Sequence, residues 1–351
     1  MAVLVATAVC AAPLEEPFEF IVAPADANNP RNSEADMLQL RDGRLLLAWT
    51  DFYGAARSDW AQARISARYS SDRGRTWGGK FTLQENIGQM NVMEPDLLRL
   101  KSGRVLLLFC RKNSEADCRP MVRLSGDDGG TFSPPREMPI TPAPSYTGFN
   151  HDRAIQLKSG RILMPVFFTS DYRIDPHIRS RVYYSDNEGA DWKPSQTVID
   201  IPESKAGAQE PGVIELKDGR VLMWMRTSLG RIYKAYSADA GLSWSKPEAM
   251  ELQSPLSPQS MKRHPRGDLI LVWNNSPDKR WPLTSAVSTD EGSTWTHRKD
   301  VDTTADHTFA YTSVEFLKDR ALLTYYVGPP AGSGGTWSLK LKAVPLDWFY
   351  H

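Results

Sequence analysis

Ionisable side chains stand beside apolar stretches at several places in this sequence, where a fold can bring them together. Glu210 lies shortly before the segment VIELKDGRVLMWM, and Arg226 follows that segment directly. Arg280 lies in a polar turn, and Tyr311 opens a later apolar segment. A guanidinium binds a carboxylate through two parallel hydrogen bonds and keeps its proton at neutral pH. A phenol becomes a nucleophile when a neighbouring base accepts its proton. The chemistry open to these residues is anion binding and acid–base or covalent catalysis.

Two shorter polar clusters are each expected to begin the inner strand of a repeat, namely Glu94-Pro95-Asp96 and Asn150-His151-Asp152-Arg153. The 6 histidines are scattered without metal-ligand spacing, and the 3 cysteines, Cys10, Cys110 and Cys118, show no such spacing either. We therefore expect no metal site. Cys110 and Cys118 are predicted either to pair across a hairpin or to remain free buried thiols.

The elements that position these residues are repeated strands. A polar turn followed by an apolar strand occurs 6 times in the chain. The turns are Asp42-Gly43-Arg44, Ser102-Gly103-Arg104, Ser159-Gly160-Arg161, Asp218-Gly219-Arg220, Arg266-Gly267-Asp268 and Lys318-Asp319-Arg320. Internal repetition of this kind is typical of solenoids and propellers.

A second motif, Ser-x-Asp-x-Gly-x-Thr-Trp with small variations, follows each of the first five turns. Its copies occupy residues 70–77, 125–132, 185–192, 237–244 and 288–295, and Asn187 replaces the aspartate in the third. These are Asp-boxes. The carboxylate is expected to accept backbone N–H groups of a hairpin turn, the glycine to supply a positive φ, and the aromatic ring to fill the hairpin base. We assign these residues a structural role.

The repeats predict an all-β protein, because no stretch shows convincing helical periodicity. Six units of four antiparallel strands, with Asp-box hairpins, indicate a six-bladed β-propeller. Residues 339–344 are expected to pair with N-terminal sequence and complete a blade. We predict a single propeller domain over residues 21–351.

The composition and the N-terminal sequence indicate which partners and which kinds of membrane or targeting segment to expect. The formal net charge is zero, which argues against a nucleic-acid partner. No segment reaches the roughly 20 apolar residues that a membrane-spanning helix needs. Residues 1–20 are predicted to be a signal-peptide remnant or a leading segment, because residues 2–12 are small and apolar. A first strand or a shortened end is the alternative.

Several of these motifs resemble those of the sialidase (neuraminidase) family. The family carries a glutamate, a strand, a glycine turn and a strand ending in Met-Arg, and residues 210–226 are similar over that full length. Its first arginine precedes the first apolar strand, as in Pro30-Arg31-Asn32-Ser33. Its acid/base aspartate precedes the first Asp-box, as Asp59 does. Residues 275–280 and 310–314 resemble the segments of its third arginine and its tyrosine. The resemblance extends from about residue 30 to the end.

The resemblance implies a retaining exo-α-sialidase that cleaves terminal sialic acid from glycans. The carboxylate of the sugar would be held by three arginines: Arg31, Arg226 and Arg280. Asp59 would protonate the leaving oxygen and then activate water. Glu210 would accept the proton of the nucleophile Tyr311, since a carboxylate nucleophile would be repelled by the substrate carboxylate. The mechanism that the resemblance implies requires no metal or organic cofactor. A substrate outside the cell, together with the N-terminus, predicts a secreted or periplasmic protein.

The chain departs from the family pattern in one respect. The family ends the strand after the tyrosine with a glutamate that supports the first arginine, whereas this strand ends in Tyr325-Tyr326-Val327. Glu34 or Asp36 is expected to take over that support. Asp51 shares a loop with Asp59 and is the alternative acid/base residue.

The two shorter clusters occupy blade positions equivalent to those of Arg31 and Glu210. Their residues are therefore expected either to line the channel and contact the glycerol or N-acyl arm of the sugar, or to join blades by hydrogen bonds. They are Glu94, Asp96, His151, Asp152 and Arg153.

Two other functions remain open on the sequence. One is a propeller glycosidase or lyase for another carboxylated sugar, a uronic or different nonulosonic acid, with His151 or Asp59 as the acid or base. The other is a carbohydrate-binding propeller without turnover, which would need neither Glu210 nor Tyr311.

Overall fold

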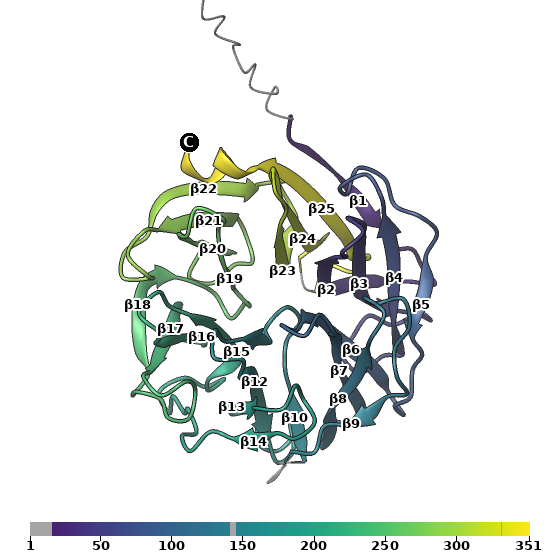
Figure 1. Cartoon of the computed structure of the whole chain (residues 1–351). Coiled ribbons are helices and arrows are strands. Elements are labelled where there is room, and N and C mark those ends of the chain that lie inside the picture. The colour runs from purple at the N-terminus through teal and green to yellow at the C-terminus, as the bar shows by residue number, and fades with distance from the viewer. Residues whose placement is uncertain (1–15, 141–144, 331) are drawn as a thin grey trace, which may run out of the picture.

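The computed structural model describes residues 16–140, 145–330 and 332–351 and is built almost entirely of β-strands. Figure 1 shows these strands in groups around a common centre. The one helix in the described part is η1, a short 3-10 helix over Leu346–Tyr350. No helix among the described residues has the length and apolar character to cross a membrane.

Within each group neighbouring strands pair antiparallel, and most groups have four strands. The group that holds both ends of the described chain contains β1 (Phe18–Ala23), β25 (Ser338–Pro345), β24 (Arg320–Gly328) and β23 (Thr308–Phe316). The next groups along the chain are β2 (Arg31–Gln39), β3 (Leu45–Phe52), β4 (Ala63–Ser70) and β5 (Phe81–Gln84), then β6 (Asn91–Arg99), β7 (Val105–Ser114), β8 (Asp117–Ser125) and β9 (Arg136–Glu137).

The remaining groups follow in chain order. They are β10 (Tyr146–Gly148), β11 (Ile155–Gln156), β12 (Ile162–Thr169), β13 (Arg179–Ser185) and β14 (Lys193–Pro194), then β15 (Gln209–Glu215), β16 (Val221–Arg226), β17 (Arg231–Ser237) and β18 (Glu248–Gln253), and finally β19 (Ser260–Arg263), β20 (Leu269–Asn274), β21 (Leu283–Ser288) and β22 (Thr296–Asp302). Parallel bridges between β4 and β6 and between β8 and β10 join the three groups that hold β2 to β14 into one 13-stranded sheet.

The two ends of the described chain meet in one sheet, because β1 pairs antiparallel with β25. The expected pairing of residues 339–344 with N-terminal sequence is therefore confirmed. Phe18 to Phe20 belong to β1, so the last residues of the predicted leading segment lie in this sheet. Residues 1–15, which carry the rest of that prediction and Cys10, lie outside the described residues.

The hydrophobic cores lie between neighbouring groups. One core combines Leu45 and Leu47 of β3 with Leu322 of β24 and Leu341 of β25. Another joins β3 to β7, and a third joins β16 to β20. Each middle strand thus buries both faces, which explains why the repeated strands are continuously apolar rather than alternating.

The Ser-x-Asp-x-Gly-x-Thr turns connect outer strands and have one geometry. In the first, Asp72 accepts hydrogen bonds from the backbone N–H of Thr76 at 2.9 Å and from its hydroxyl at 2.6 Å. Gly74 has a φ of 84°, a conformation that glycine adopts without steric cost. These residues hold the periphery together and lie outside the site described below.

The inner strands carry β-bulges that point side chains into the centre. The bulges of β2, β6, β15 and β23 interrupt the register at four residues with positive φ, namely Glu34 (44°), Glu94 (62°), Glu210 (45°) and Tyr311 (58°). Positive φ is uncommon outside glycine and often marks a functional position. A bulge changes the direction of a side chain without ending the sheet. The same feature, a bulge in the inner strand, therefore directs four ionisable groups toward the centre.

Candidate active site

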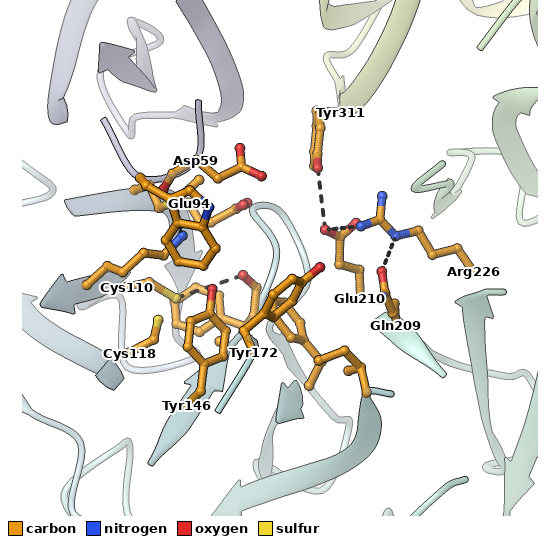
Figure 2. Close-up of a pocket in the computed structure, with 17 residues that line it drawn as sticks. Asp59, Glu94, Cys110, Cys118, Tyr146, Tyr172, Gln209, Glu210, Arg226 and Tyr311 are labelled. Atoms are coloured by element: carbon orange, nitrogen blue, oxygen red, sulfur yellow. Dashed lines mark hydrogen bonds and ion pairs between the residues drawn. The ribbon is translucent and has the colours of Figure 1, made fainter. Parts of the chain in front are cut away.

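A cavity at the centre brings together side chains from five of the groups of strands. We call it the central cavity. Its lining residues are Asp59, Trp60, Met93, Glu94, Cys110, Lys112, Cys118, Tyr146, Gly148, Phe149, Phe167, Tyr172, Ile178, Gln209, Glu210, Arg226 and Tyr311. Figure 2 shows Tyr311, Glu210 and Arg226 on one side of it and Cys110, Cys118 and Tyr146 on the other.

Glu210 links two of the predicted site residues. The hydroxyl of Tyr311 lies 3.4 Å from Glu210 Oε1 and donates to it. Arg226 Nη2 lies 2.9 Å from the same oxygen. Burial raises the pKa of Tyr311 well above its usual value, and the charge of Glu210 raises it further. The phenol is therefore neutral at pH 7, and its deprotonation needs the adjacent carboxylate.

One nitrogen of the Arg226 guanidinium is bonded within its hairpin, whereas another has no partner in the described part of the chain. Its Nε donates to Gln209 at 3.2 Å, and residues 209 and 226 are opposite each other in the β15–β16 hairpin. Its Nη1 is buried and has no hydrogen-bond partner among the described residues. A buried guanidinium N–H without an acceptor is unfavourable unless a ligand supplies one. Arg226 thus has an unused donor beside Tyr311 and Glu210.

Arg31 lies on β2 with each of its nitrogens bonded. Nε donates to Ser33 at 2.7 Å, Nη2 pairs with Glu34, and Nη1 lies 2.6 Å from Asp59 Oδ1. The guanidinium carbon lies 5.3 Å from the ring centroid of Trp337. Glu34 therefore supplies the support for which Glu34 and Asp36 were the candidates.

Arg280 lies in the loop between β20 and β21, beside Tyr311. Its guanidinium carbon is 5.7 Å from the Tyr311 ring centroid, and its Nη1 donates to the hydroxyl of Tyr326 at 2.9 Å. Arg31 and Arg280 are not among the residues that line the central cavity; they adjoin it through Asp59 and Tyr311. The strand-end tyrosine noted in the sequence thus contacts the third arginine rather than the first.

Asp59 lies in the loop after β3 with its side chain 55% exposed. Its backbone oxygen accepts hydrogen bonds from Asn91 at 3.0 Å and from Lys112 at 3.1 Å, which anchors the loop. Desolvation would raise the pKa of the carboxyl, but the charges of Arg31 and then Lys112 lower it to about 2. Asp59 is therefore ionised in the unliganded site.

Asp51 differs sharply from Asp59, the residue with which it competes for the acid/base role. Its side chain is fully buried and accepts hydrogen bonds from Arg64 at 3.1 Å and from Lys80 at 3.1 Å. It does not line the central cavity.

Several residues predicted to line the channel join groups of strands instead. Asp96 accepts the backbone N–H of Arg153 at 2.7 Å, and Arg153 donates to the backbone oxygen of Gln259 at 2.6 Å. Asp152 pairs with Lys262. None of these lines the central cavity. Their placement matches the expected alternative of hydrogen bonds between blades, and Glu94 alone of the five lies on the cavity wall.

His151 lies behind the site. Its ring centroid is 5.8 Å from that of Tyr311, and it is completely buried. Burial, and then the charge of Arg153, lower its pKa well below the usual value. The imidazole is therefore neutral at pH 7. It lies between β10 and β11, so the prediction that this cluster begins the inner strand is wrong by a few residues.

The sequence analysis missed several cavity residues, namely Trp60, Lys112, Tyr146 and Tyr172. A signal for Lys112 existed, because the repeat aligns Cys110 with Arg226 and Lys112 follows two residues later. Cys110 and Cys118 are buried free thiols. Among the described residues, no group of three or more His, Cys, Asp or Glu side chains is arranged to hold a metal ion.

Comparisons with known proteins add the following. The model of the BNR repeat-like domain family matches residues 89–322. A curated sialidase of Paraclostridium sordellii is 29% identical over 229 residues, which are 58% of this chain and 55% of that protein. The chain therefore spans about half the length of this relative.

Solved structures with a similar fold are much more distant in sequence. The NanB sialidase of Streptococcus pneumoniae matches with a TM-score of 0.76 and 15% identity, over 96% of this chain and 72% of that one. The intramolecular trans-sialidase of Ruminococcus gnavus matches with a TM-score of 0.75 and 14% identity, over 94% of this chain and 97% of that one. At such identities the similarity establishes the fold.

Proposed function

Because the chain belongs to the BNR repeat-like domain family, we propose that it is a sialidase-type glycoside hydrolase that removes terminal sialic acid with net retention. The observation that carries this proposal is the contact of the Tyr311 hydroxyl with Glu210, which Arg226 also contacts. A buried phenol that faces a carboxylate is the arrangement that a tyrosine nucleophile needs. The curated relative named a sialidase supports the same substrate.

The substrate carboxylate is assigned to the three arginines. Arg226 offers the unused Nη1 donor, and Arg280 lies over the Tyr311 ring. Arg31 is already paired with Asp59, so the carboxylate must compete with Asp59 for its Nη1. Guanidinium groups suit this task because they bind carboxylates with fixed geometry and stay charged.

The reaction proceeds in two displacements. Glu210 accepts the proton of Tyr311 while the phenolic oxygen attacks the anomeric carbon, and Asp59, protonated, donates to the leaving oxygen. In the second step the ionised Asp59 removes a proton from water, which attacks the same carbon and releases Tyr311 to take its proton back from Glu210. Two inversions give net retention.

The test is fluorophore release from an aryl α-sialoside by the wild type and by Tyr311→Phe. We expect turnover by the wild type and a loss of more than about 100-fold in the variant. Tyr233→Phe is the matched control, because Tyr233 lies on β17 and does not line the central cavity. Absence of release by the wild type at every pH between about 4 and 8 would refute the proposal.

The wider organisation is part of this proposal. We assign the groups of strands to a six-bladed propeller that residues 21–351 form as a single domain. The pairing of β1 with β25 supports a ring whose ends meet in one blade. A glycan substrate outside the cell supports a secreted or periplasmic location.

A further inference from the structure

Lys112 places an ammonium group in the wall of the central cavity, and this group is not in ion-pair contact with a carboxylate of the described residues. The residue lies on β7 and is 4% exposed. Its Nζ donates to the backbone oxygen of Asp59 at 3.1 Å and contacts Met93 Sδ at 3.3 Å. It lies 4.6 Å from the Trp60 ring centroid. Within the described part of the chain, no Asp or Glu oxygen lies within the 4.0 Å of an ion pair.

Glu94, which lies nearby in the wall, makes no ion pair with Lys112. Burial, and then the charges of Glu34 and Glu210, raise the pKa of Glu94 well above its usual value. Burial therefore disfavours the ionised form of Glu94, which is the form that would attract Lys112. An ammonium carries three N–H donors, and a thioether is only a weak acceptor. Lys112 thus has an N–H donor without a strong acceptor among the described residues. This arrangement is unfavourable, because burying an unpaired charge is costly.

The space that Lys112 faces has a defined chemical character. We call it the side chamber, and its walls are Trp60, Cys110, Cys118, Tyr146, Phe149 and Phe167. The Lys112 ammonium lies 5.8 Å from the ring centroid of Tyr146. Burial raises the pKa of Tyr146 well above its usual value, so its hydroxyl is a neutral donor. The chamber therefore combines apolar walls with a hydroxyl and an ammonium, both able to donate.

We infer that Lys112 is a specificity-determining residue, and that the side chamber takes a ring substituent with a short apolar stem and an oxygen acceptor at its end. This inference rests on the proposed function, because it assumes that a sialic acid occupies the central cavity. An N-glycolyl group fits the description, since it ends in a hydroxyl where an N-acetyl group ends in a methyl. A site built to bind a substrate oxygen rejects the analogue that lacks it, because its own polar group is then left unpaired.

The experiment compares kcat/KM for aryl α-glycosides of N-glycolyl and N-acetyl neuraminic acid, which differ only in that oxygen. We expect the wild type to prefer the N-glycolyl substrate by about 10-fold. Lys112→Met keeps the length of the stem without the charge, and its ratio should fall to about 1. The ratio isolates specificity, because loss of the anchor on the Asp59 loop affects both substrates alike. Lys246→Met, at an exposed position outside the cavity, should keep the wild-type ratio.

The outcomes separate this inference from the proposed function. Turnover of both substrates with a wild-type ratio near or below 1 overturns the inference and leaves the proposed function standing. An unchanged ratio in Lys112→Met overturns it as well. No turnover of either substrate by the wild type overturns both. If Lys112→Met does not fold, Tyr146→Phe removes the neighbouring donor, and the same fall in the ratio is expected.

Discussion

The carboxylate of Asp59 lies 2.6 Å from Nη1 of Arg31 in the unliganded site. In the proposed mechanism the same guanidinium binds the substrate carboxylate, and the same Asp59 must carry a proton. The two requirements are compatible if the substrate displaces Asp59 from Arg31. Loss of that contact removes the largest of the charge interactions that lower the pKa of Asp59, so that substrate binding itself favours protonation of the acid.

The first prediction concerns stability at low pH. Arg31 and Lys112 lower the pKa of Asp59 to about 2 against the opposing desolvation, whereas the value in an unfolded chain is about 3.9. Because the folded pKa is the lower one, the stabilisation is complete above about pH 4 and is lost as the pH falls through about 2. We expect the melting temperature of Asp59→Asn to be below that of the wild type at pH 6, and the difference to shrink between about pH 4 and pH 2.

Calorimetry over this pH range checks the prediction. Asp278→Asn is the control, since Asp278 is exposed and outside the site. Its difference from the wild type should not follow the same pH dependence. A difference for Asp59→Asn that stays constant down to pH 2 contradicts the Arg31–Asp59 pairing.

The second prediction separates the acid from the base through the leaving group. A phenolate with a low pKa departs without protonation, whereas a sugar hydroxyl needs an acid. Asp59→Ala should therefore lose about 10-fold more kcat/KM on a sialylated sugar than on an aryl sialoside. Glu210→Gln should lose about 100-fold or more on both substrates alike, because its role is toward Tyr311. Steady-state kinetics with both substrates test this prediction. If the loss of kcat/KM depends on the leaving group to the same extent in both variants, the assigned roles are wrong.

The third prediction concerns the support of Arg31. Glu34 contacts Arg31 Nη2, so Glu34→Gln keeps the shape of the side chain and removes its charge. We expect KM to rise about 10-fold with little change in kcat, because a misplaced arginine weakens ground state and transition state alike. Glu215→Gln, at the other end of β15 from Glu210, should show neither effect. A fall in kcat with KM unchanged would place Glu34 in the chemical step instead.

The sequence predicted most of the architecture and the pairing within one hairpin. Glu210 and Arg226 lie near each other along one β-hairpin, and the register that opposes Gln209 to Arg226 follows from the glycine turn between them. Local pairing of this kind depends only on alternation and turn chemistry. Glu34 was one of the two residues expected to support Arg31, and it lies three residues from Arg31 on the same strand.

The sequence could not predict the bulges or the side chamber. Glu34, Glu94, Glu210 and Tyr311 adopt positive φ although none is glycine, and no residue pattern announces this conformation. The side chamber joins Trp60, in the loop between β3 and β4, to residues of β7, β8, β10 and β12, so its walls come from three different groups of strands. Lys112 therefore became a candidate only when Trp60 and Tyr146 were found beside it.

The fourth prediction concerns the buried ion pair beneath the site. Asp152 is 6% exposed and pairs with Lys262, which is 31% exposed. Burial, and then the charges of Asp152 and Asp96, raise the pKa of Asp36 well above its usual value. Removing the lysine takes away the cation that contacts Asp152 and leaves these carboxylates with Arg153 as the charged group that offsets them. We expect Lys262→Met to lower the free energy of unfolding by about 3 kcal/mol at pH 7, at the lower end for a buried pair because the lysine is partly exposed.

Urea denaturation at two pH values tests this account. A carboxyl whose folded pKa is raised destabilises the fold above that pKa and is relieved as the pH falls below it. Burial raises the pKa of Asp96 to about 6, so the loss in Lys262→Met should be smaller at pH 5 than at pH 7. Arg44→Met removes the exposed pair of Arg44 with Asp42 and should change the free energy of unfolding by less than about 1 kcal/mol at either pH. Equal losses for Lys262→Met at both pH values would show that lost packing, rather than the unpaired carboxylates, destabilises the variant.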